Sequence, residues 1–89
     1  MEDVNDTLGE RGKRYGDFAT HAAITQALKQ EMRKTPNWRG GKLTPSQMEA
    51  LDMIQHKIGR ILNGDPAYAD SWHDIAGYAT LVEKECDGG

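Results

Sequence analysis

Apolar residues recur at steps of three and four in the middle of the chain, and this spacing predicts an amphipathic helix over residues 44–63. Thr44 is a candidate N-cap, followed by a first-turn proline and by Gln47, which completes a capping box. Asn63 and Gly64 are suited to a left-handed cap and predict where the helix ends. The apolar stripe of this helix comprises Met48, Leu51, Ile54, Ile58, Ile61 and Leu62.

A further helix is predicted over residues 70–85, where Asp70 or Ser71 can act as the N-cap. Its apolar residues are Trp72, Ile75, Ala76, Ala79 and Val82. Gly77 falls inside this helix, where glycine costs about 1 kcal/mol relative to alanine. Close packing against another helix, or a nearby ligand, would explain a glycine at this position, and close packing is the simpler explanation.

The N-terminal third has a weaker helical pattern. Gly12 and Gly16 interrupt it, so we expect only a short, broken helix before Asp17. From Asp17 a cleaner pattern predicts a helix that ends near Lys34, because the proline two residues later biases its neighbour out of helical conformation.

Together these elements predict an all-α fold, a small antiparallel bundle of three main helices preceded by a short broken N-terminal helix. The chain forms one domain over residues 1–89, with a loop at 35–43 and a flexible C-terminal tail at 86–89. A chain this short buries a modest core, so we expect the bundle to be completed by formation of a homodimer.

Composition and charge narrow the classes of function. The single cysteine, Cys86, excludes an intramolecular disulfide framework and agrees with a reducing compartment. No apolar run approaches the roughly 18 residues that span a bilayer, and the acidic N-terminus does not resemble a signal peptide. We therefore expect a cytoplasmic protein with no membrane partner. The net charge is −3, and nucleic acid is not an expected partner. The simplest interpretation of the basic stretch Lys29–Lys42 is a solvated helix end and loop, although it could face phosphate.

Carboxylates occur on both of the C-terminal helices. A polar stripe beside the apolar one on helix 44–63 consists of Glu49, Asp52, His56 and Arg60. Asp70 and Asp74 lie one turn apart on the next helix. Four such acids could surround Mg²⁺, which prefers oxygen ligands. The short connection makes these helices antiparallel and places Asp70 nearer to Arg60 than to Glu49, so either Asp74 reaches toward Asp52 or a second subunit supplies the opposing helix.

Each carboxylate also has a simpler structural interpretation. Glu49 and Asp52 could form a solvent-exposed helical face, Asp70 could cap its helix, and Asp74 could form an ion pair with Lys57 or Arg60.

The basic and aromatic residues suggest how a nucleotide could be bound. His56, Lys57 and Arg60 could contact phosphate, and Arg60 could engage two oxygens through its planar guanidinium. Tyr15 and Trp72 could stack on a base, although Trp72 is equally suited to packing in the core or at a dimer interface. We interpret His21 as a structural residue.

Three stretches, Glu10–Phe18, His56–Gly64 and Asp70–Ala79, together resemble a family of small phage and prophage proteins of unassigned function. If the protein is phage-encoded, its location would be the host cytoplasm. That family is distantly similar to the all-α nucleoside triphosphate pyrophosphohydrolases of the MazG type. Those enzymes hold Mg²⁺ between a Glu-x-x-Glu helix and a Glu-x-x-Asp helix, release monophosphate and pyrophosphate, and work as dimers or tetramers.

The resemblance implies site residues here. Glu49 and Asp52 match the first motif and Asp74 the last acid of the second, whereas Ser71 stands where the second motif has glutamate. The implied catalytic residues are Glu49, Asp52 and Asp74, the implied metal ligands are these three and Asp70, and the implied substrate-binding residues are Lys57, Arg60, His56, Tyr15 and Trp72. The alternative function is a non-enzymatic helical interaction protein of a phage that binds a host factor.

Overall fold

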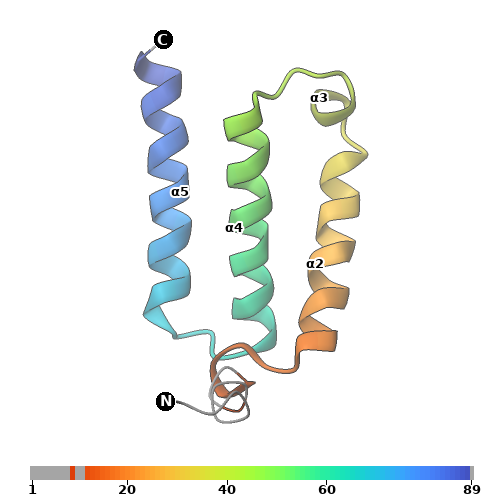
Figure 1. Ribbon diagram of the computed structural model, residues 1–89, viewed down its shortest axis with the longest axis vertical. Helices are drawn as coiled ribbons and strands as arrows, with labels where there is room; N and C mark the ends of the chain where they lie inside the picture. Colours follow the sequence, from red (N-terminus) through yellow and green to blue (C-terminus); the bar gives the residue numbers. More distant parts are fainter. Residues whose placement is uncertain (1–8, 10–11, 89) are drawn as a thin grey trace, which may run out of the picture.

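Three long helices lie side by side in one layer, with α4 (Pro45–Asn63) between α2 (Phe18–Arg33) and α5 (Ala69–Gly88) (Figure 1). The computed structural model describes residues 9 and 12–88, and no strand occurs in these residues. Neighbouring helices run antiparallel, and a short helix, α3 (Pro36–Arg39), follows α2. The predicted all-α fold is confirmed.

The helix boundaries follow the capping residues. The Gln47 N–H donates to Thr44 Oγ1 at 3.1 Å and the Thr44 N–H donates to Gln47 Oε1 at 2.9 Å, so the predicted capping box of α4 is confirmed. Asp17 caps α2 by accepting a hydrogen bond from the Thr20 N–H at 3.0 Å. Pro36 begins α3 inside the segment predicted as a loop, because its fixed φ suits a first helical position.

The end of α5 differs from the prediction. The helix continues to Gly88, so residues 86–88 extend it where we expected a flexible tail. None of the described helices is long and apolar enough to cross a membrane.

The end of α4 also differs from the prediction. Gly64 has φ −128°, so it does not form the left-handed cap expected from the Asn63-Gly64 pair. A glycine is needed there for a different reason: a Cβ atom at Gly64 would overlap the backbone of Arg14 and Tyr15. The tight approach of residues 14–16 to the helix end therefore excludes a side chain at this position.

Hydrogen bonds hold this N-terminal segment across the end of α4. The Asn63 side-chain amide donates to the carbonyl oxygens of Tyr15 at 3.0 Å and Asp17 at 2.9 Å. The Asp65 N–H donates to the carbonyl of Arg14 at 2.7 Å. Gly16, with φ +80°, makes the turn that joins residues 12–15 to α2.

Close packing between helices occurs at Gly59, between α4 and α2. A Cβ atom at Gly59 would lie 2.6 Å from Thr25 Cγ2 and 3.1 Å from His21 Cε1. Gly77, by contrast, has no atom within 4 Å of the corresponding position, so the expectation that it marks a close approach is wrong. The short distance between α2 and α4 brings His21 to the side chains of α4.

The layer does not enclose a hydrophobic core. Among the described apolar residues only Ala50 is buried, at 7% exposure. Large apolar side chains remain exposed on all three long helices, namely Phe18, Leu51, Ile58, Leu62, Trp72 and Leu81.

Candidate functional site

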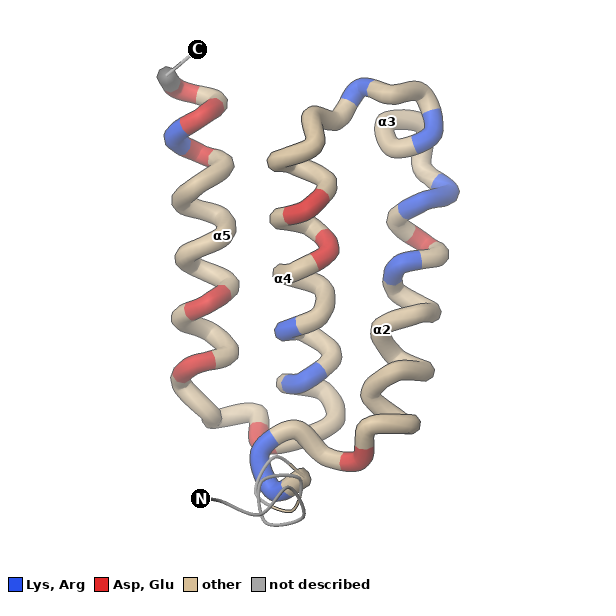
Figure 2. Tube along the Cα trace, viewed as in Figure 1, with Lys and Arg blue, Asp and Glu red and all other residues tan. Residues whose placement is uncertain are grey.

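The four carboxylates predicted as metal ligands do not converge within one chain. The acidic positions of α4 lie toward the end of the layer near α3, whereas those at the start of α5 lie beside the basic positions of α4 (Figure 2). The described residues contain no group of three or more His, Cys, Asp or Glu side chains that could hold a metal ion. The antiparallel arrangement separates the start of α4 from the start of α5.

Each acid has a different neighbour. Asp52 turns toward α2 and pairs with Arg33 at 3.3 Å, and Asp70 accepts a hydrogen bond from the Tyr68 hydroxyl at 3.0 Å. Glu49 lines a separate groove between the start of α4 and the end of α5. In one chain these four carboxylates therefore do not form the oxygen cluster that Mg²⁺ requires.

Asp74 forms the ion pair that we considered as its alternative role. Its Oδ2 lies 3.0 Å from Lys57 Nζ, and this hydrogen bond and charge lower the pKa of the Asp74 carboxyl. The pair joins α5 to α4 and occupies Lys57, which was predicted to bind phosphate. Lys57 therefore points away from Arg60, although the two positions are only three residues apart on α4.

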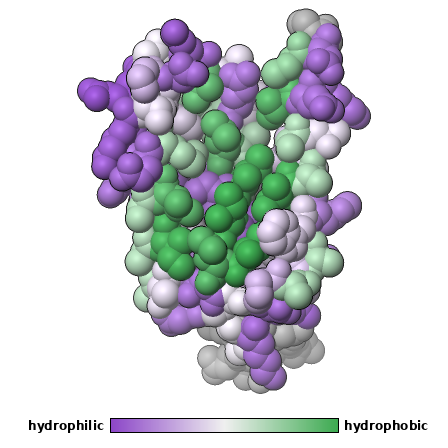
Figure 3. Space-filling model, turned by 180° about the vertical axis from the view of Figure 1, so that it is seen from behind, coloured by the Kyte–Doolittle hydropathy of each residue, from purple (hydrophilic) through white to green (hydrophobic). Residues whose placement is uncertain are grey.

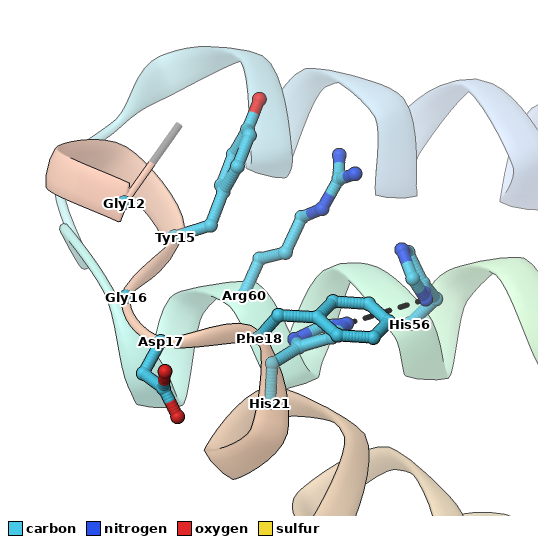
Figure 4. Close-up of a pocket in the computed structure, with 8 residues that line it drawn as sticks. All are labelled: Gly12, Tyr15, Gly16, Asp17, Phe18, His21, His56 and Arg60. Carbon is cyan, nitrogen blue, oxygen red and sulfur yellow. Dashed lines mark hydrogen bonds between the residues drawn. The ribbon is translucent and has the colours of Figure 1, made fainter. Parts of the chain in front are cut away.

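Three other predicted residues, Tyr15, His56 and Arg60, line one cavity of about 580 Å³ between the N-terminal segment, α2 and α4 (Figure 4). The cavity lies on the α2 side of α4, not on the α5 side where we expected the site. Its remaining lining residues are Gly12, Gly16, Asp17, Phe18 and His21.

Arg60 is positioned by an aromatic ring. Its Cζ lies 4.1 Å from the centroid of the Tyr15 ring, a cation–π contact. Tyr15 in turn packs on Tyr68 in a T-shaped arrangement, with the ring centroids 5.9 Å apart. No carboxylate of the described residues lies within ion-pair distance of Arg60. The guanidinium is thus held in place beside the cavity by the Tyr15 ring and forms no ion pair with a described acid.

Two histidines meet at the inner end of the cavity. Nε2 of His21 lies 3.4 Å from Nδ1 of His56, and the rings are nearly perpendicular with centroids 4.6 Å apart. His21 is only 5% exposed. Burial lowers the pKa of both rings, with Arg60 adding repulsion, and the pKa of His56 falls to about 4. Both imidazoles are therefore neutral at neutral pH and can donate or accept hydrogen bonds without adding charge.

Phe18 and Asp17 complete the rim. Phe18 is 79% exposed and its ring lies beside His21, with the centroids 6.4 Å apart. One carboxylate oxygen of Asp17 caps α2 by accepting hydrogen bonds from both the backbone N–H and the hydroxyl of Thr20. Trp72 lies outside this cavity, half exposed, and its indole N–H donates to the Pro66 carbonyl at 2.9 Å.

Sequence reasoning missed Phe18 and assigned His21 a purely structural role. No local signal joins His21 to His56, because 35 residues separate them. The glycine at position 59, one turn from His56, is the sequence feature that could have indicated a close neighbour on that side of α4.

Comparison with known proteins matches residues 2–85 to one protein family. The chain belongs to the DUF6378 family, which is described as a domain of unknown function. No curated protein and no solved structure gives a significant match. The DUF6378 match covers α2 and α4 entirely, and with them every residue that lines the cavity. Phage origin and similarity to MazG-type enzymes stay predictions.

Proposed function

We propose that this protein binds a nucleotide in the cavity formed by residues 12–17, α2 and α4. The observation that carries the proposal is Arg60, a guanidinium stacked on Tyr15 that forms no ion pair with a carboxylate of the described residues. An arginine held in this way favours an anion that presents two oxygens, such as a phosphate group, because its planar guanidinium can donate to both at once.

The electrostatics around the cavity favour negative charge. After burial, which is the largest cause, the positive charges of Arg60, Lys57 and Lys29 also lower the pKa of His56, so these cations act together at that ring. A cation bound there would be repelled, whereas a phosphate group would be attracted. The neutral imidazoles of His21 and His56 could add hydrogen bonds to phosphate or sugar oxygens.

The size and the aromatic rim favour a base in addition to phosphate. A volume of about 580 Å³ lies within the range of small-molecule sites. The exposed ring of Phe18 offers a stacking surface at the rim, and Tyr15 offers another beside Arg60. A phosphate-bearing aromatic molecule fits these features better than phosphate alone.

Binding without hydrolysis is the function that we propose. Hydrolysis of a nucleoside triphosphate with Mg²⁺, implied by the MazG-type resemblance, would require Glu49, Asp52 and Asp74 to act together. Asp52 and Asp74 are paired with Arg33 and Lys57, so we derive no catalytic step from them. A magnesium site shared with a second subunit stays a prediction.

Titration calorimetry with the common nucleoside triphosphates, in the presence and absence of Mg²⁺, tests the proposal. We expect binding by the wild-type protein and a loss of roughly 10- to 100-fold in affinity for Arg60→Met, which removes a charge-assisted phosphate contact. The matched control is Arg39→Met, because Arg39 is exposed on α3 and does not line the cavity. It should bind like the wild type.

Two further ligands sharpen this test. A nucleoside without phosphate should bind far more weakly than the triphosphate, and inorganic phosphate should not reproduce the triphosphate affinity. If no nucleotide gives binding heat, or if Arg60→Met binds as well as the wild type, the proposal is wrong. The first outcome would favour the non-enzymatic interaction protein instead.

A further inference from the structure

A second cavity, of about 520 Å³, lies where the end of α2, α3 and α4 meet, and we name it the corner pocket. α2 runs from the cavity proposed for nucleotide to this pocket. Phe18 lines the first, and Met32, fourteen residues later and about 21 Å along the helix, lines the second. The two sites are therefore separate.

The wall of the corner pocket is mostly apolar. Met32, Trp38 and Leu43 are half-buried there, so each retains apolar surface in contact with water. The hydroxyl of Thr35, a polar lining residue, already donates to the Met32 carbonyl at 2.7 Å. A concave apolar wall of this kind favours an apolar side chain or ring, because filling it removes apolar surface from water on both partners. The apolar lining residues are Met32, Pro36, Trp38, Leu43 and Leu51.

Positive charge is concentrated around this pocket. The stretch Lys29–Lys42 has a local charge of +4, whereas the rest of the chain carries −7. Figure 2 shows the basic positions of this stretch toward the end of α2, on α3 and in the loop before α4. Figure 3, seen from behind, shows strongly hydrophilic side chains beside apolar ones at the same corner, now at the upper left. Two of the five cations are paired, Arg33 with Asp52 and Lys34 with Glu31.

Arg39 and Lys42 are the cations best placed to act at the pocket. Arg39 directly follows Trp38 and Lys42 directly precedes Leu43, so each is next in the chain to a lining residue, and both are exposed. Neither forms an ion pair with a carboxylate of the described residues. Arg33 adds positive charge at the wall itself, because its Cζ lies 5.2 Å from the centroid of the Trp38 ring.

We propose that the corner pocket binds an acidic peptide segment of another protein. One large apolar side chain of the peptide fills the pocket, and carboxylates on either side of it face Arg39 and Lys42. Charge complementarity selects this partner, because the corner is the positive region of a chain whose net charge is −3. The apolar wall adds the requirement for an apolar residue between the acids.

Two other classes of anionic partner fit the corner less well. A nucleic acid presents a long row of phosphates, whereas the cations occupy one corner and the rest of the chain is negative. A lipid surface is contacted by protruding apolar side chains, whereas the apolar surface here lines a pocket.

Binding of fluorescein-labelled synthetic peptides, measured by fluorescence anisotropy at physiological ionic strength, tests the proposal. One short peptide has a central leucine flanked on each side by aspartate and glutamate residues, and a second has serine in place of the leucine. We expect a dissociation constant below about 1 mM for the leucine peptide. The serine peptide should bind roughly tenfold or more weakly, because it buries no apolar side chain. Higher salt should weaken both by screening the charges.

Arg39→Glu/Lys42→Glu reverses two charges beside the pocket and should weaken binding of the leucine peptide by roughly tenfold or more. The matched control is Lys13→Glu/Lys84→Glu, which changes the net charge by the same amount at exposed positions outside the corner. It should bind within about threefold of the wild type, because distant charges are largely screened at this ionic strength. All four positions are exposed, so both variants should keep the helical circular dichroism of the wild type.

The tryptophan in the wall reports whether the apolar side chain enters the pocket. The chain has two tryptophans, so Trp72→Phe leaves Trp38 as the only one. Unlabelled leucine peptide should shift the emission of Trp38 to shorter wavelength, because filling the pocket removes water from the half-buried ring. The serine peptide should produce a smaller shift.

Several outcomes would overturn the proposal. These are no binding of the leucine peptide, equal affinity for the leucine and serine peptides, an unchanged Trp38 emission, or equal losses in the two double variants. A single-stranded DNA oligonucleotide or phosphatidylserine vesicles that bind more tightly than either peptide, and lose binding in Arg39→Glu/Lys42→Glu, would also overturn it, because the corner would then recognise phosphate. Arg39→Glu/Lys42→Glu should retain nucleotide binding, since neither residue lines that cavity, so the two proposals can fail independently.

Discussion

Replacing Gly59 with alanine tests whether close contact between α2 and α4 organises the cavity. The added Cβ would lie 2.6 Å from Thr25 Cγ2 and 3.1 Å from His21 Cε1, both shorter than a normal van der Waals contact. Thr25 cannot yield easily, because its β-branched side chain is stiff and its hydroxyl donates to the Ala22 carbonyl at 3.2 Å. Accommodation therefore requires the two helices to separate or a hydrogen bond to break.

The magnitude follows from two opposing effects. Alanine is favoured over glycine inside a helix by about 1 kcal/mol. Overpacking a tight contact costs about 1–3 kcal/mol, and losing the Thr25 hydrogen bond costs about 1 kcal/mol more. We expect Gly59→Ala to lower the free energy of unfolding by about 1–3 kcal/mol.

Gly77→Ala is the control that isolates the steric effect. It makes the same substitution inside α5, where no atom lies within 4 Å of the new Cβ. The helix propensity effect alone should raise the free energy of unfolding by about 0.5–1 kcal/mol. The two variants should therefore differ by about 2 kcal/mol or more.

Urea unfolding followed by circular dichroism measures this difference. With a urea m-value of about 1 kcal/mol/M, the two midpoints should differ by about 2 M. All proteins must be compared at one protein concentration, because an associating protein gains stability by mass action. If Gly59→Ala is as stable as Gly77→Ala, the close approach of α2 and α4 is wrong, and with it the proximity of His21 to His56.

Two further predictions concern buried polar groups. Gln55 is 3% exposed, and neither polar atom of its side-chain amide has a hydrogen-bond partner in the described part of the chain. Gln55→Met removes this unpaired amide and should therefore raise the free energy of unfolding, measured by urea unfolding, by about 1–3 kcal/mol. A destabilised variant would show that the amide is satisfied. Because the pKa values of His21 and His56 are lowered in the folded protein, the unfolded chain binds protons at a higher pH than the folded chain as the pH falls. The free energy of unfolding should therefore be constant above pH 7 and should fall between pH 6.5 and about 4. The His56 shift corresponds to about 3.4 kcal/mol, which partial exposure of the ring reduces to about 1–2 kcal/mol. The loss should be smaller in His56→Gln, and a flat stability profile over this range would contradict the buried, neutral histidine pair.

Local features of the sequence predicted the helices well. The capping box at Thr44 and the N-cap at Asp17 act over three residues, so the hydrogen bonds that start α4 and α2 can be inferred without knowing the fold. The pair Asn63-Gly64 was interpreted wrongly for the same reason. Its role depends on Tyr15, 48 residues away, whose carbonyl accepts from the Asn63 amide.

In the candidate site, too, residue type could be used from the sequence, whereas the direction in which each side chain points could not. The sequence singled out Tyr15, His56 and Arg60 by residue type, because aromatic, imidazole and guanidinium groups suit a nucleotide wherever they lie, and the structure brings the three to one cavity. The sequence placed their site toward α5, and it grouped Lys57 with Arg60. The structure turns Lys57 toward Asp74 and Arg60 toward Tyr15, since the two residues point in different directions around α4.

By itself, the sequence determined that this chain is helical, where its main helices begin, and which side chains have binding chemistry. Those properties depend on spacing and on residue type, which are local. Only the tertiary structure decided which carboxylates are paired, which histidines meet and which apolar stripe lacks a partner. These outcomes depend on the side of α4 that each neighbouring helix covers. That arrangement is set by contacts between residues far apart in the chain, namely the packing of Gly59 against α2 and the hydrogen bonds from the Asn63 amide to the N-terminal segment.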